Sequence, residues 1–264
     1  MRRGPILLPL ILITLGVLFL LDNFNLIDFD LGRFLSTWWP IILILIGLNV
    51  LIEPLLYRGG SDVETLAIDR GAHERAEVRI DFGAGKLRVG PAAPGKLIEG
   101  TFVGGVRHEV SPDGRVRLRG DWQPLWWWGS WRGRGFDWTV GVSPDIPLSL
   151  RVDSGAAEAA LDLTELKVTH FELHTGASST VVRLPRSAGV TDVKIESGAA
   201  SVKLFVPEGV AARIKSTMGL GSSDIDQRRF PYRNGEYVSP DFDTAPNKIT
   251  IRSEGGVGSL TVSG

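Results

Sequence analysis

Tryptophan and arginine gather in one stretch of this 264-residue chain. The segment DWQPLWWWGSWRGRGFDW, residues 121–138, holds six of the eight tryptophans. Tryptophan and arginine dominate the hot spots of protein interfaces, and indole rings suit the headgroup level of a membrane. The segment is therefore a candidate interaction loop for a protein partner or a membrane surface, with the residues Trp122, Trp126, Trp127, Trp128, Trp131, Arg132, Arg134 and Trp138.

Two other interpretations of this segment stay open. Its rings could fold down and cover an end or a side of the domain, which would make them structural. They could also stack on the bases of a single-stranded nucleic acid, with arginines beside the phosphates. A formal net charge of −1 gives no support to that partner, so no nucleic acid is expected.

Two glycine-containing segments invite comparison with phosphate-binding loops, and both fail. In DFGAGKL, the phosphate-loop pattern GxxxxGK[ST] requires a glycine where Ile80 stands and a hydroxyl where Leu87 stands. In GLG, at 219–221, the third glycine of a dinucleotide fingerprint is replaced by Asp224. These glycines are interpreted as structural, and no cofactor is expected.

The chain also lacks the usual sets of catalytic and metal-binding residues. It has no cysteine, which excludes thiol nucleophiles, thiolate metal sites and disulfides. His170 and His174 are four apart and share a face, but no third ligand is evident. No GxSxG motif occurs. The chain is therefore predicted not to be an enzyme, with no catalytic residue and no metal.

A repeated strand pattern organises the second half of the chain. LRVDSGAAEAALDL, FELHTGASSTVVRL and VKIESGAASVKLFV align on three glycines spaced by 176 − 155 = 21 and 198 − 176 = 22 residues. Apolar residues at every second position predict strands with one buried face, and Ser/Thr-Gly-Ala predicts a tight turn that admits only a very small residue. Degenerate copies bring the stack to about six units, with the structural turn glycines Gly83, Gly155, Gly176, Gly198, Gly219 and Gly256.

The first 57 residues are strongly apolar and predict a transmembrane helical hairpin. Ile6 to Leu21 carries no charge, and the run from Trp38 to Tyr57 is long enough to span a bilayer. A signal peptide is disfavoured because no small-x-small cleavage site follows the first run. Basic residues outside the two spans and an acidic loop between them place both termini in the cytoplasm, in a two-span protein of the plasma membrane.

The predicted organisation is therefore a two-helix transmembrane region, residues 1–58, followed by an all-β repeat domain, residues 59–264, with the Trp/Arg-rich insertion at about 104–147. Within that insertion, residues 106–119 are predicted to form a hairpin with a Pro-Asp-Gly turn. The fold class is a β-solenoid-like stack of short strands.

These segments resemble a known family. GVLFLLDNFNLI followed by WWPIILILIGLNVLI is similar to the LiaI/LiaF-type transmembrane region of bacterial cell-envelope proteins. The segment from DWTVGVSPDIP to STVVRLP, residues 137–185, resembles the toast-rack β-domain that often accompanies it. Its most specific features are Pro147, the Ala-Leu-Asp-Leu of 160–163 and the repeated Gly-Ala turns. The resemblance implies a stack of short strands on a membrane hairpin and carries no catalytic residue.

The resemblance also implies a regulatory role in the envelope-stress response, beside a two-component sensor kinase. The chain is therefore predicted to be a non-enzymatic, membrane-anchored regulatory or scaffold protein. Its expected partners are the lipid bilayer and a protein such as a sensor histidine kinase, and a homo-oligomer is compatible with the sequence. The alternative is an extracytoplasmic adhesin-like or envelope-binding β-module with inverted topology.

Overall fold

The computed structural model describes residue 24, residues 63–120 and residues 136–264. The chain divides between Gly59 and Gly60 into two units, and every described strand belongs to the second. The two predicted membrane spans lie outside the described residues. Among the residues that are described, no helix combines the length and apolar character needed to cross a bilayer.

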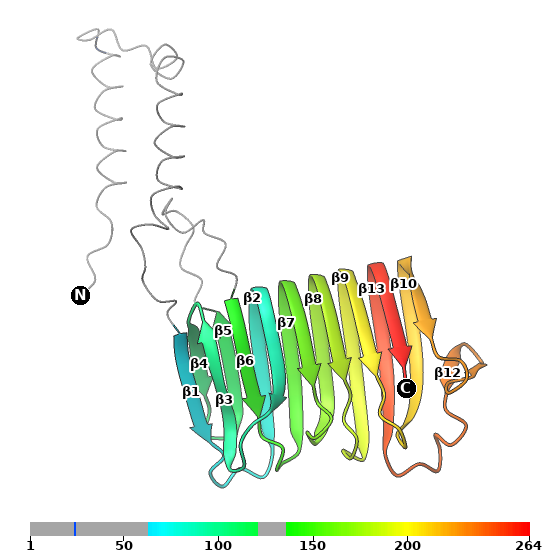
Figure 1. Cartoon of the computed structure of the whole chain (residues 1–264), viewed down its shortest axis with the longest axis horizontal. Helices are drawn as coiled ribbons and strands as arrows, with labels where there is room; N and C mark the ends of the chain where they lie inside the picture. Colours follow the sequence, from blue (N-terminus) through cyan, green and yellow to red (C-terminus); the bar gives the residue numbers. More distant parts are fainter. Residues whose placement is uncertain (1–23, 25–62, 121–135) are drawn as a thin grey trace. The chain divides into compact units, whose positions relative to one another are not determined.

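The described strands join in one sheet, and six long parallel strands form its main part (Figure 1). Each is 15 or 16 residues long and contains one of the six repeat glycines. In their order across the sheet they are β2 (Ala76–Pro91), β7 (Leu148–Asp162), β8 (Val168–Arg183), β9 (Val190–Phe205), β13 (Lys248–Ser263) and β10 (Ala211–Ile225).

Each long strand bends at its glycine. In β10, the Oγ atoms of Ser216 and Ser223 are 2.8 Å apart, whereas seven residues of straight strand would separate them by about 23 Å. Burial alternates with a change of phase at the same place: Val152 and Ser154 are buried before Gly155, and Ala157 is buried after it. The strand therefore has a first limb before the glycine and a second limb after it, and both limbs face one core.

Close stacking explains why glycine occupies the bend. A Cβ atom on Gly155 would lie 2.7 Å from the carbonyl oxygen of Gly83, and one on Gly176 would lie 2.8 Å from that of Gly155. Neither glycine has a positive φ, so a left-handed conformation is not the reason. The predicted tight turn is wrong in form, because the strand continues through the glycine, but the predicted restriction to a very small residue has this steric cause.

The register of the sheet confirms the predicted period. Val152 pairs with Leu173, and Leu173 pairs with Ile195, so equivalent positions of successive units lie side by side. One neighbour relation differs from the order of the chain. The last strand, β13, inserts between β9 and β10, which places Gly256 between Gly198 and Gly219.

The other side of β2 has two short strands in place of one bent strand. β5 (Arg115–Gly120) pairs with the first limb of β2, and β6 (Phe136–Val142) pairs with its second limb, both in parallel. β5 ends at Gly120 and β6 begins at Phe136, and the residues between them lie outside the described part.

The remaining strands extend the two ends of the sheet. β4 (Val106–Val110) and β5 form the predicted hairpin, with Gly114 at φ +84° in its turn. β3 (Lys96–Val103) and β1 (Val63–Asp69) continue the sheet beyond β6. The predicted insertion, 104–147, thus contains three strands that are part of the sheet. At the opposite end, the short strands that follow β10 are β11 (Tyr232–Arg233) and β12 (Glu236–Val238).

Candidate functional site

The outer face of the first limbs carries two rows of mostly charged side chains. Alternation along each strand turns these residues away from the core, and the parallel register aligns them from strand to strand. The row four residues before each glycine is Arg79, Arg151, Glu172, Lys194, Arg252 and Lys215. The row two residues before each glycine, here called the acidic row, is Asp81, Asp153, His174, Glu196, Glu254 and Thr217.

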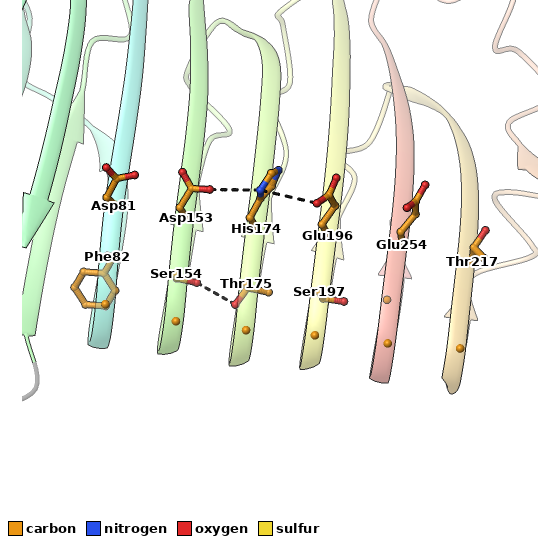
Figure 2. Close-up of a pocket in the computed structure, with 17 residues that line it drawn as sticks. Asp81, Phe82, Asp153, Ser154, His174, Thr175, Glu196, Ser197, Thr217 and Glu254 are labelled. Carbon is orange, nitrogen blue, oxygen red and sulfur yellow. Dashed lines mark hydrogen bonds and ion pairs between the residues drawn. The ribbon is translucent and has the colours of Figure 1, made fainter.

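Strand β8 reverses the charge order of its neighbours and so joins the two rows. Like charges on adjacent strands, about 4.8 Å apart, repel each other. Glu172 relieves the repulsion in the basic row, with its Oε2 2.9 Å from Nη1 of Arg151. His174 separates two carboxylates in the acidic row, with Nδ1 3.4 Å from Oδ1 of Asp153 and 4.0 Å from Oε2 of Glu196 (Figure 2).

Asp81 ends the acidic row in a cluster of guanidinium groups. Its Oδ1 lies 2.8 Å from Nε of Arg79, and its Oδ2 lies 2.6 Å from Nη2 of Arg117 and 3.1 Å from Nε of Arg119. Burial by itself raises the pKa of Asp81, but the hydrogen bonds from the three arginines outweigh it and lower the pKa to about 2. Asp81 is therefore ionised at neutral pH and holds β2 to β5.

The same balance applies to the carboxylate in the basic row. Burial raises the pKa of Glu172, but the hydrogen bond from His170 and the charge of Arg151 outweigh it, and the net shift is downward. His170 and His174 thus lie on the outer face of β8, each beside a carboxylate. Among the residues that the structure describes, no group of three or more acidic and histidine side chains is arranged to hold a metal ion.

A pocket of about 900 Å³ lies along the row of glycines and draws its lining from all six long strands (Figure 2). The acidic row lines it, together with the residues just before the glycines. Two of those are hydroxyls that bond to each other, Ser154 Oγ donating to Thr175 Oγ1 at 3.0 Å. Six strands span about 24 Å. Carboxylates and hydroxyls in such a row can accept hydrogen bonds from an extended cationic or hydroxyl-bearing ligand.

Most of the predicted interaction loop lies outside the described residues, namely Trp122, Trp126, Trp127, Trp128, Trp131, Arg132 and Arg134. Trp138 is described, and its assignment to that loop is wrong. It lies in β6 with 0% of its surface exposed. Its ring packs edge-on against Phe82 and Phe102, with centroids 5.3 and 5.1 Å away. Apolar alternation along β6 turns it into the core.

The six repeat glycines all line the pocket and stack on one another from strand to strand. The sequence analysis did not predict the pocket, because acids that alternate with core residues are typical of a solvated face. A signal was present: the position two before each glycine is an acid in four of six units and histidine in one. The repeat alone does not show that, in the bent strands, the acidic row lines a pocket together with the six glycines.

Two family descriptions match the chain. Residues 6–51 match the LiaI-LiaF-like transmembrane region. Residues 58–205, more than half of the chain, match the N-terminal domain of toast_rack. A search of curated proteins found no match.

Among solved structures, a protein of Clostridium sporogenes with a proposed role in cell adhesion aligns with a TM-score of 0.66 and 19% identity, over 76% of this chain and 98% of its own. A proposed adhesin of Bacteroides fragilis aligns over 77% of this chain and 98% of its own, with 9% identity and a TM-score of 0.33. The first likeness shows a common fold. The second alignment, with its low TM-score, does not show a common fold.

Proposed function

The chain belongs to the toast-rack family, and from that premise we propose that it is a non-enzymatic, membrane-anchored regulatory or scaffold protein of the bacterial cell envelope. The family resemblance predicted from the sequence is confirmed. The LiaI-LiaF-like region at residues 6–51 makes the chain a membrane protein. Its β-domain has the fold of the Clostridium sporogenes protein.

One observation supports a scaffold best. The charged groups of the outer face bind one another: Arg79 bridges Asp81 and Asp153, and Arg151 bridges Asp153 and Glu172. Ion pairs of this kind, each joining side chains on the same strand or on neighbouring strands, keep the strands in register. A stiff rack of this kind is suited to presenting a surface to a partner.

We assign the partner to the class of sensor histidine kinases, with a role in the envelope-stress response. The support is the combination of the LiaI-LiaF-like region with a toast-rack domain in one chain. In this proposal two membrane spans leave both termini in the cytoplasm, so the rack meets the cytoplasmic part of the kinase.

Affinity purification of the tagged full chain from native membranes tests the partner. A sensor histidine kinase is expected to co-purify, and a tagged unrelated two-span protein provides the control. Recovery of the chain without any kinase, under conditions that preserve other membrane complexes, would contradict this assignment. Deletion of the gene is further expected to change the kinase-dependent response to cell-wall inhibitors.

An adhesin-like or envelope-binding module is the second candidate, and the proposed cell-adhesion role of the structurally similar protein favours it. Topology separates the two candidates, and the absence of cysteine makes single-cysteine labelling clean. With an impermeant thiol reagent on intact cells, the regulatory proposal expects labelling of Asn25→Cys and none of Gly59→Cys. The opposite pattern would favour the extracytoplasmic module.

A further inference from the structure

The long strands end at β10 in an open edge (Figure 1). On one side β10 pairs with β13 along both limbs. On the other side only Arg213 and Ile214 pair, with β12. From Lys215 to Ile225 no described strand covers that side, so its backbone N–H and C=O groups form a template for another strand.

This edge lacks the features that usually prevent strand addition. Natural edges are protected by charges, prolines or bulges. Between Lys215 and Ile225 the only charged residues are those at positions 215 and 224, and there is no proline. Residues 219–224 are all exposed, and Leu220 exposes 78% of its surface. The opposite end of the sheet differs, since its two edge strands, β1 with the sequence VETLAID and β4 with the sequence VRHEV, both carry charged side chains.

The bend restricts how a strand can be added to this edge. A bent strand can pair with another bent strand only if the two bends are aligned and the core-facing residues of one strand lie opposite core-facing residues of the other. A second β10 meets both conditions in antiparallel orientation, about a two-fold axis that passes between Gly219 and Leu220. In that register Ser216 lies opposite Ser223 of the second copy, and both occupy core-facing positions equivalent to the buried Ile195 and Val202.

The same register brings opposite charges together. Lys215 lies opposite Asp224 of the second copy, and the two-fold axis repeats the pair. Both side chains face outward and are exposed, and neither makes an ion pair with any residue of the described part. A shift by one residue would separate these charges and set core-facing residues against outward-facing ones. The register that geometry requires is thus also the one that charge favours.

We propose that two copies of this chain associate through the β10 edges, residues 215–224, in antiparallel pairing, so that two racks continue as one sheet. The interface is isologous, as a closed two-fold dimer requires. This inference goes beyond the proposed regulatory function and holds whether or not a kinase is the partner.

Cysteine cross-linking of the full chain in detergent tests the geometry, because the natural chain has no cysteine. Leu220 lies beside the axis, so Leu220→Cys is expected to give a disulfide-linked dimer on mild oxidation. Its matched control is Val257→Cys: Val257 pairs with Leu220 in the register and is 53% exposed. In the dimer two Val257 positions are three strand spacings apart, about 14 Å, which is beyond disulfide reach.

Charge reversal tests the register. Lys215→Asp sets like charges opposite each other twice and is expected to weaken self-association roughly tenfold in analytical ultracentrifugation. The double variant Lys215→Asp with Asp224→Lys restores the pairs and is expected to return within about threefold of the natural chain. Lys203→Asp is the control, because Lys203 occupies the position equivalent to Asp224 on β9, where both edges are paired.

Two outcomes would overturn the proposal. One is the absence of a Leu220→Cys dimer, or a dimer equally abundant for Val257→Cys, while circular dichroism shows both variants folded. The other is a double charge variant that associates no better than Lys215→Asp. Cross-linking of Leu220→Cys in cells only to a different polypeptide would assign the edge to another protein and would likewise reject self-association.

Discussion

The two ends of the rack close the same core in different ways. Next to β2, the strands β5 and β6 take the place of one bent strand, and the core there is aromatic, with Trp138 in edge-on contact with both Phe82 and Phe102. In β10 at the other end, core-facing positions on the two limbs hold Ser216 and Ser223, which bond to each other. The β2 end is thus closed by additional strands and aromatic rings, whereas the β10 end has hydroxyl side chains at core-facing positions.

The difference shows what a stacked repeat demands of its members. An interior strand has a neighbour on each side, so one solution, glycine at the bend and apolar residues inside, serves all of them. An end strand faces water on one side. It must be covered by other elements, as β2 is by β5 and β6, or become polar at its bend, as β10 does. The second solution leaves the backbone edge available for pairing.

The largest effect is expected at the aromatic end. Trp138→Ala removes a fully buried ring that contacts Phe82 and Phe102, and should lower the free energy of unfolding by about 3–5 kcal/mol. Leu220→Ala at the other end should change it by less than about 0.5 kcal/mol. Urea unfolding of the full chain in detergent, followed by circular dichroism, measures both. Equal losses would mean that the two ends do not differ as described.

The glycine row should respond differently in the interior and at the end. Gly176→Ala puts a Cβ 2.8 Å from the oxygen of Gly155, and strands on both sides prevent relaxation, so a loss of about 2–3 kcal/mol is expected. Gly219→Ala puts a Cβ 3.0 Å from the carbonyl oxygen of Gly256. Because β10 is an end strand that can shift outward, a loss of about 1 kcal/mol in the free energy of unfolding is expected. Thermal unfolding of the two variants checks the order. A larger loss at Gly219 would contradict it.

The guanidinium cluster makes the β2 end sensitive to acid. Because the pKa of Asp81 is lowered from 3.8 to about 2, its ionised form stabilises the fold fully above pH 4, and that stabilisation is lost as pH falls from about 4 to 2. After allowance for solvent screening the loss is about 1–2 kcal/mol. Unfolding of Asp81→Asn should lack this step, whereas Asp192→Asn, at an exposed site on β9, should keep it.

The smallest effects are expected from the hydroxyls. Ser154→Ala removes the partner of Thr175 in a buried setting, which should cost about 1 kcal/mol. Ser223→Ala removes the exposed bond to Ser216 at the end, and water can replace it at a cost of about 0.5 kcal/mol or less. Equal costs for the two variants would show that the end strand is as well shielded from water as the interior.

Much of the fold was predictable because its signals are local. Alternation before and after each glycine assigned Val152 and Leu173 to the core, and a Pro-Asp-Gly turn located the β4–β5 hairpin. The role of Trp138 was not predictable in this way. It stands at the end of a run of similar residues, which hides its alternation with Val140 and Val142, and that alternation turns it inward beside Leu87 of β2 and Phe102 of β3.

Only part of the candidate pocket was predictable from the sequence. The acidic row can be read from the sequence as the position two before each glycine, and its charges are evident there. Its lining depends on the bend of the strands, which puts the glycine backbones beside the row. Which charges neutralise each other was also hidden, because Arg117 and Arg119 reach Asp81 from a strand that starts 34 residues later and belongs to an interrupted unit.

By itself, the sequence determined which residues face the core and where each strand bends, because period-two alternation and a glycine that must be small act within one strand. Only the tertiary structure decided the order of the strands. β13 lies between β9 and β10 in the sheet, although β10 comes before β13 in the chain. The core-facing residues near the bend explain this order. β13 has Leu260 at the position where β10 has Ser223, and the strand with the more polar residue is more stable at the end of the sheet that is exposed to water.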